Sequence, residues 1–229
     1  MDNSKMGCQI LKPLKKNEQK FGTPKIKGRI HIDEKYVKVK GHWEYRLTAI
    51  DNKNKFVFAE LFVAERTLRA CIAFLQQIKH WCYAQMLEVY KKEQKKPSTK
   101  RKLIVFVADK FENYKTAWIK LFYKITRMRS GVPIACIKYG LKHNNNSVER
   151  HNRELSRRFD SLNVFQTHAG GESMSALLKI LHNYINPHNM LNGKTPAEAA
   201  GLHLQIGENK LLNLITLAAI KNRDDDKLT

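Results

Sequence analysis

"GRIHIDEKYVKVKGHWEYRLTAIDNKNKFVFAELFVAE", residues 28–65, decides the fold class of this chain because it predicts three consecutive strands. Isoleucines alternate with polar neighbours within residues 28–41, which is typical of a half-buried strand. Two further strand-like runs, at about 43–50 and 55–63, are joined by the hairpin turn signal DNKN at 51–54. The stretch therefore predicts an antiparallel meander.

The hydrophobic period changes after residue 65. Apolar residues recur at three- and four-residue steps from Leu68 to Val89, which predicts a long amphipathic helix. Strands and helices then alternate: a buried strand "KLIVFVAD" at 102–109, a helix at 113–125, a strand "VPIACIKYG" at 132–140, a helix carrying Glu149, a helix at about 172–185 and two short C-terminal helices.

This order predicts an α/β fold in which a mixed five-stranded sheet, with three antiparallel strands followed by parallel additions, is flanked by helices. The length of 229 residues favours one domain with extensions. We expect residues 1–28 to form a basic arm or linker, residues 29–190 the core and residues 191–229 a helical tail.

The charge of the chain indicates an anionic partner. Lys and Arg number 42 against 21 Asp and Glu, giving a formal net charge of +21 that opposes compaction. Nucleic acid is the leading candidate, because Lys and Arg contacts to phosphate supply most sequence-independent affinity. A membrane surface is disfavoured, since no basic amphipathic anchor or lipidation motif is present.

The expected location is the cytoplasm. No apolar run reaches the roughly 18 residues of a membrane span, and the N-terminus lacks the apolar core of a signal peptide. The four cysteines form no C-x-x-C pair. Cys71 and Cys82 lie on the apolar stripe of the long predicted helix, which indicates reduced core residues.

Three acids stand where a solvated charge is unfavourable. Asp33 follows the isoleucines of the first strand, Asp109 ends the most hydrophobic strand, and Glu149 lies in the first turn of a basic helix. Adjacent strands and a neighbouring helix can bring the three carboxylates together, where they repel one another strongly. Mg²⁺ relieves that repulsion, and a pair of such ions can drive an in-line phosphoryl displacement.

Simpler interpretations of the same residues remain open. An acid at the end of a strand is commonly a turn or cap residue, and Glu149 can pair with Arg153 for only about 0.3 kcal/mol. The sequence contains no zinc-binding pattern. His143, His151 and His188 are therefore interpreted as ordinary polar residues.

Four stretches together resemble the DDE transposases of prokaryotic insertion sequences, whose catalytic core is of the ribonuclease H and retroviral integrase type. They are "HIDEKYVKVKGHWEYRLTAID" (31–51), "VADKFENYKTA" (107–117), "NNNSVERHNRELSRR" (144–158) and "NYINPHNMLNGKTPAEAAG" (183–201). The resemblance spans about residues 29–201, and the four motifs stand in the family's order and spacing.

The resemblance implies a ribonuclease H-like fold and a DNA transposase that cleaves the ends of its element and transfers the strands to target DNA. Asp33, Asp109 and Glu149 would be the catalytic residues and would bind two Mg²⁺ ions, with Mn²⁺ as an alternative. The residues that would contact DNA lie on or beside the third-acid helix: Asn146, Arg150, Asn152, Arg153 and Arg157.

Because two element ends must be joined, we expect a homodimer or a higher assembly, with DNA as the partner and no membrane. Two rival functions stay open at this point. One is a ribonuclease H-like nuclease that hydrolyses without transferring strands. The other is a truncated or non-catalytic DNA-binding remnant of a transposase.

Overall fold

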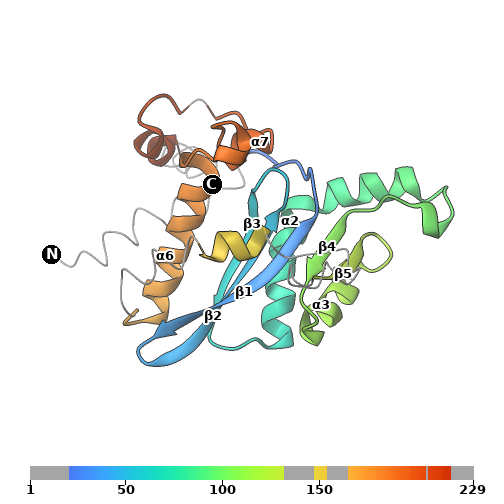
Figure 1. The fold of residues 1–229 in the computed structure, drawn as a ribbon, viewed down its shortest axis with the longest axis horizontal. Helices are drawn as coiled ribbons and strands as arrows, with labels where there is room; N and C mark the ends of the chain where they lie inside the picture. Colours follow the sequence, from blue (N-terminus) through green and yellow to red (C-terminus); the bar gives the residue numbers. More distant parts are fainter. Residues whose placement is uncertain (1–20, 132–146, 154–164, 205, 218–229) are drawn as a thin grey trace, which may run out of the picture.

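Three antiparallel strands in the computed structural model form the meander that the sequence predicts: β1 (Ile30–Val39), β2 (His42–Asp51) and β3 (Val57–Val63) (Figure 1). Lys40 and Gly41 join β1 to β2, with φ angles of 44° and 87°. Two left-handed residues make a tight hairpin turn whose twist matches that of the strands. The structure describes residues 21–131, 147–153, 165–204 and 206–217.

The sheet is completed by two short parallel strands, β4 (Val105–Ala108) and β5 (Arg127–Ser130). Its strand order is β3-β2-β1-β4-β5, which confirms the predicted mixed five-stranded sheet. The sequence predicted no strand at β5, because "RMRS" is a short, charged edge strand without apolar alternation. The strand predicted at 132–140 lies outside the described residues.

Two helices cover one face of the sheet, α2 (Leu68–Glu93) and α3 (Glu112–Phe122) (Figure 1). Thr67 caps α2, its side chain accepting a hydrogen bond from the Ala70 amide. The short turn η2 (Ser98–Lys100) follows. The buried face of α2 confirms the predicted long amphipathic helix and the core positions of both cysteines; it consists of Cys71, Phe74, Leu75, Ile78, Cys82 and Met86.

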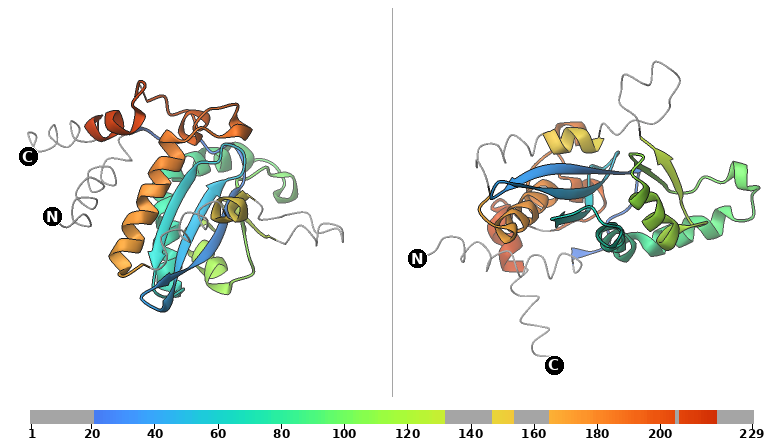
Figure 2. Two further views of the ribbon diagram at one scale, coloured as in Figure 1. Left: turned by 60° about the vertical axis from the view of Figure 1, so that its left-hand side comes forward. Right: turned by 90° about the horizontal axis from the view of Figure 1, so that it is seen from below.

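The opposite face carries the helical segment 147–153, and helix α6 (His168–Ile180) lies along the β3 edge of the sheet (Figures 1 and 2). Val148 packs against β2 and β3 in a small buried cluster. α6 approaches β3 closely, because a Cβ on Gly171 would lie 2.7 Å from the Phe62 ring. The helix begins four residues before the predicted start at 172 and continues into the wider turn η3 (Leu181–Ile185).

The C-terminal part of the chain packs onto the same core. It contains the turn η4 (Asn189–Leu191), helix α7 (Pro196–Ala199), which begins at a capping box, and a helical stretch at 210–217. One hydrophobic cluster includes side chains from before residue 29 and after residue 190, among them Phe21, Ala197, Leu202 and Leu214. These side chains therefore pack in the same core as residues between the predicted boundaries at 28 and 190.

The described residues contain no helix with both the length and the apolar character of a membrane span. Helices lie on both faces of the sheet, so its central strands are covered on the two sides (Figures 1 and 2). The central strand β1 contains Asp33, and its neighbour β4 ends directly before Asp109.

Candidate active site

The pairing of β1 with β4 brings Asp33 and Asp109 to the same level of the sheet. In this parallel pair Ile30 lies opposite Phe106 and His31 opposite Val107. The sequence separation between Asp33 and Asp109 equals that between the partners of each pair. Continued by two residues, the same register therefore sets Asp109 beside Asp33. Asp33 lies on the face that carries residues 147–153, where it meets Asn152. Asp109 follows the end of β4, and its charge acts on Glu34, Cys71 and Tyr114, which lie toward α2 and α3.

Asp33 is held in a largely buried position on that face. Its Oδ2 accepts a hydrogen bond of 3.0 Å from Nδ2 of Asn152 in the helical segment. Burial, together with the negative charges of Glu34 and, more weakly, Glu149, raises the pKa of Asp33 from 3.8 to about 7. Glu149 itself is exposed. The structure thus brings the first and third predicted acids within electrostatic range of each other.

Glu34, an acid that sequence reasoning did not select, occupies the other face of β1. It forms an ion pair with Arg66 and accepts a 3.1 Å hydrogen bond from the Tyr114 hydroxyl on α3. Burial and then the charge of Asp109 raise the pKa of Glu34 above its usual range. An acid directly after Asp33, on the apolar side of a buried strand, is the sequence signal that could have revealed it.

Four carboxylates, those of Glu149, Asp33, Glu34 and Asp109, therefore form a series of electrostatic neighbours. In the part of the chain that the structure describes, no three Asp, Glu, His or Cys side chains lie close enough to hold a metal ion as they stand. The donors nevertheless fit Mg²⁺, which prefers carboxylate oxygens. A cation would also relieve the burial and like-charge repulsion that raise the pKa of Asp33.

The residues expected to contact DNA divide into three groups. Arg150 and Arg153 are exposed on the helical segment, where they can reach a phosphate. Asn152 is only 5% exposed and its amide donates to Asp33, so its observed contact is with the carboxylate instead of solvent. Asn146 and Arg157 lie outside the described residues.

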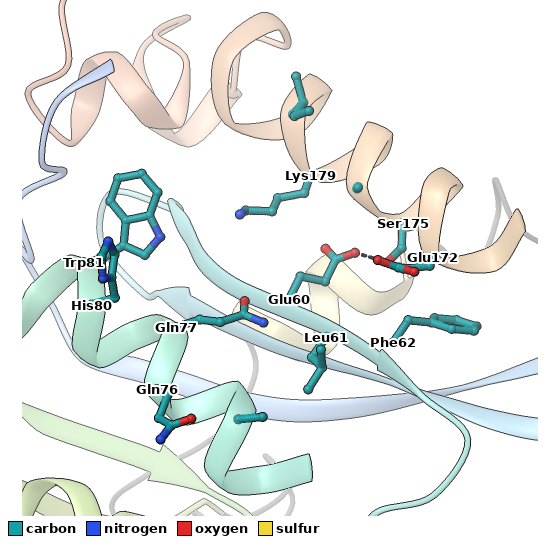
Figure 3. A pocket seen from close by; sticks show the side chains of 13 residues that line it. Glu60, Leu61, Phe62, Gln76, Gln77, His80, Trp81, Glu172, Ser175 and Lys179 are labelled. Atoms are coloured by element: carbon teal, nitrogen blue, oxygen red, sulfur yellow. Dashed lines mark hydrogen bonds between the residues drawn. The ribbon is translucent and has the colours of Figure 1, made fainter. Parts of the chain in front are cut away.

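A separate cavity of about 460 Å³ lies between α2, α6 and the edge strand β3 (Figure 3). None of the predicted acids lines it. Glu60, at its wall, is 4% exposed; it forms an ion pair with the buried Arg46 and accepts a hydrogen bond from Ser175. A buried pair with a third hydrogen-bonding partner ties α6 to the sheet, so this polar group has a structural explanation.

The mixed sheet in the order β3-β2-β1-β4-β5, flanked by helices, defines a ribonuclease H-like fold. The chain belongs to the family of IS240 transposase DDE domains, whose description is "DDE domain" and whose family model matches residues 27–188. This confirms the transposase family that the sequence motifs indicated.

Several solved structures are similar to the chain. A chain in the structure of a simian T-cell lymphotropic virus intasome in complex with PP2A regulatory subunit B56 gamma shares 14% identity at a TM-score of 0.46. The match covers 82% of this chain and 61% of that chain, so this chain spans less than two thirds of its length. The HTLV-2 integrase catalytic core with magnesium shares 12% identity at a TM-score of 0.43, covering 76% and 94%.

The catalytic domain of Mos1 mariner transposase shares 12% identity at a TM-score of 0.29, covering 90% of this chain and 95% of that domain. A comparison with curated proteins finds no significant match.

Proposed function

We propose that this protein cleaves the ends of a mobile DNA element and joins them to target DNA, with Asp33, Asp109 and Glu149 as the catalytic metal ligands. The observation that carries the proposal is the state of Asp33. Its carboxylate is largely buried, the negative charges of Glu34 and Glu149 act on it, and its pKa is raised to about 7. Such an arrangement is unfavourable in the apo protein and becomes favourable with a divalent cation at the site.

The surrounding residues have positioning roles in this proposal. Asn152 holds Oδ2 of Asp33 through its amide, so the carboxylate keeps one orientation. Glu34 joins β1 to α3 through the Tyr114 hydroxyl, and this bond holds the strand that carries Asp33 against the helix that follows Asp109. Two Mg²⁺ ions, or Mn²⁺, would supply the Lewis acidity that activates an attacking oxygen and stabilises a leaving one.

DNA is the proposed partner, because the net charge of +21 favours a polyanion and would offset the repulsion of phosphates by the acids. The exposed arginines Arg150 and Arg153 would contact the backbone beside Glu149, and Asn146 and Arg157 would extend this surface. Since two element ends have to be joined, the proposed active form is a homodimer or a higher assembly, acting on DNA in the cytoplasm.

A strand-transfer assay tests the proposal. The substrates are pre-nicked DNA ends taken from the terminal repeats that flank the gene, together with a target plasmid and Mg²⁺. Glu149→Gln removes one proposed metal ligand and should abolish joining while DNA binding is retained. Glu88→Gln makes the same charge change on the solvent-exposed surface of α2, where Glu88 pairs with Lys92, and should leave joining unchanged.

The outcomes separate the rival functions. Hydrolysis of the ends without joining would support a ribonuclease H-like nuclease. DNA binding without cleavage or joining in either Mg²⁺ or Mn²⁺ would support a non-catalytic remnant. Equal joining by the wild type and the Glu149→Gln variant would remove Glu149 from the proposed metal site.

A further inference from the structure

A small pocket is lined in part by Arg150, the residue that follows Glu149 in the helical segment. It has a volume of about 230 Å³ and lies where the turn between β2 and β3, residues 147–151 and the segment after α6 meet. A site for a drug-sized ligand usually occupies about 300–1,000 Å³, so this pocket fits a smaller group. Its lining consists of Ile50, Lys55, Ser147, Arg150, His151, His182, His188 and Met190.

The polar lining of the pocket is basic. Lys55 and Arg150 are its two cations, and no acidic side chain is among the lining residues. Burial lowers the pKa of Lys55; the charge of Asp51 opposes this shift and that of Arg150 adds to it. Within the described ranges neither cation forms an ion pair. The Lys55 ammonium donates a hydrogen bond to the Asn52 carbonyl oxygen and lies 3.4 Å from the Ser147 hydroxyl, and Arg150 contacts the Met190 sulfur.

The nearest acid, Asp51, acts on Lys55 through its charge but does not line the pocket. Its side chain is fully buried and accepts hydrogen bonds from four backbone amides, those of Lys27, Gly28, Lys53 and Asn54. These bonds hold the carboxylate inside the turn between β2 and β3. The two cations of the pocket therefore lie in a lining that contains no carboxylate.

The wall of the pocket is held in place by hydrogen bonds to the backbone. His182 lies 2.8 Å through Nε2 from the Lys55 carbonyl oxygen, which makes that nitrogen the donor. His188 accepts a 3.2 Å hydrogen bond through Nδ1 from the Met190 amide. Lys55 itself has a left-handed φ of 61°, so its backbone conformation is imposed by the turn. A pre-formed basic wall binds an anion without a large ordering cost.

We propose that this pocket binds one phosphate group of the DNA backbone, with Lys55 and Arg150 as its cationic ligands and Ser147 as a hydroxyl ligand. The site rests on the proposed function, because its position beside Glu149 would fix the DNA strand relative to the catalytic acids. The pocket adds the turn between β2 and β3 to the proposed DNA-binding surface, whose other residues lie on or beside the helix that carries Glu149.

The test compares two lysines of the same turn. Lys55→Gln removes a pocket cation, and Lys53→Gln makes the same charge change at an exposed residue two positions away that does not line the pocket. Affinity for DNA ends is measured in EDTA, so that the result is independent of metal and of cleavage. Far-UV circular dichroism and thermal unfolding verify that both variants are folded, and Lys55→Arg tests whether restoring the charge restores binding.

Lys55→Gln should weaken DNA binding roughly tenfold at about 0.1 M salt and lower the salt slope by about 1 relative to Lys53→Gln. A series of DNA ends with one neutral methylphosphonate each should contain one position that weakens the wild type but has no further effect on Lys55→Gln. That non-additivity assigns the pocket to a particular phosphate.

Equal binding by the two Gln variants, or no coupled position in the series, would overturn the proposal even if the wild type joins DNA. Binding of inorganic phosphate at the pocket without any effect of Lys55→Gln on DNA affinity would overturn it too, because the site would then take free phosphate. The protein could also show a methylphosphonate position whose effect depends on Lys55 and yet never join DNA. That result would support the phosphate pocket and contradict the proposed function.

Discussion

Asp33→Asn should make the metal-free protein more stable than the wild type above pH 7. The carboxylate of Asp33 is largely buried and its pKa is raised from 3.8 to about 7. The folded protein therefore holds a proton that the unfolded chain releases at lower pH. Stability from the protonated form is fully present below pH 3.8 and is lost as the pH rises through 7. Asparagine cannot ionise, so the variant avoids that loss.

The size of the effect follows from the two pKa values. Each pKa unit is worth about 1.36 kcal/mol, so the full difference approaches about 4 kcal/mol in the free energy of unfolding. For a chain of this size that corresponds to a rise of roughly 10 °C in Tm. The advantage of the variant should be small near pH 4 and should grow through the neutral range.

Urea unfolding in EDTA, at half-unit steps from pH 5 to pH 9, measures this difference. Glu88→Gln provides the control, since it removes an exposed carboxylate and should not change the pH dependence near 7. Mg²⁺ added at pH 8 should stabilise the wild type more than Asp33→Asn, because the ion binds the ionised carboxylate. Parallel pH profiles for the wild type and Asp33→Asn would refute the reasoning.

Two further substitutions test the packing that positions the site. Tyr114→Phe removes the hydrogen bond to Glu34 and should cost about 1–3 kcal/mol in urea unfolding. That bond lowers the pKa of Glu34, so its loss raises this pKa further. The loss of unfolding free energy should therefore increase with pH. A loss that is independent of pH would contradict this account. Gly171→Ala should destabilise by about 1–2 kcal/mol in the same assay, because the new Cβ would lie 2.7 Å from the Phe62 ring. Gly170→Ala is the comparison, since its Cβ meets only the Thr167 hydroxyl, and an equal effect of both would argue against the close approach of α6 to β3.

Most of the fold could be predicted from local pattern. The alternation in residues 28–65 and the three- and four-residue period from Leu68 identify strands and a helix, because side-chain periodicity is a property of a short segment. β5 could not be found in this way. Its four residues form an edge strand with two arginines, and pairing with β4, not burial, makes them a strand.

Some residues of the candidate site could be predicted from the sequence, and others could not. Asp33 and Asp109 could be selected from the sequence because each acid interrupts or ends an apolar run, and such a position is unusual for a solvated charge. Glu34 could not be distinguished from its neighbour, because its role depends on Arg66 and Tyr114 meeting it on the other face of β1.

Sequence alone therefore determined the strands, the long helix, the acids and the basic character of this protein, all of which are recorded in residue type and spacing. Tertiary structure decided which side chains and backbone groups those residues contact. Lys55 contacts Ser147 across 92 residues of sequence and His182 across 127. The physical reason is that electrostatic and hydrogen-bond energies depend on distance in space, and packing of the two helical layers onto the sheet sets those distances.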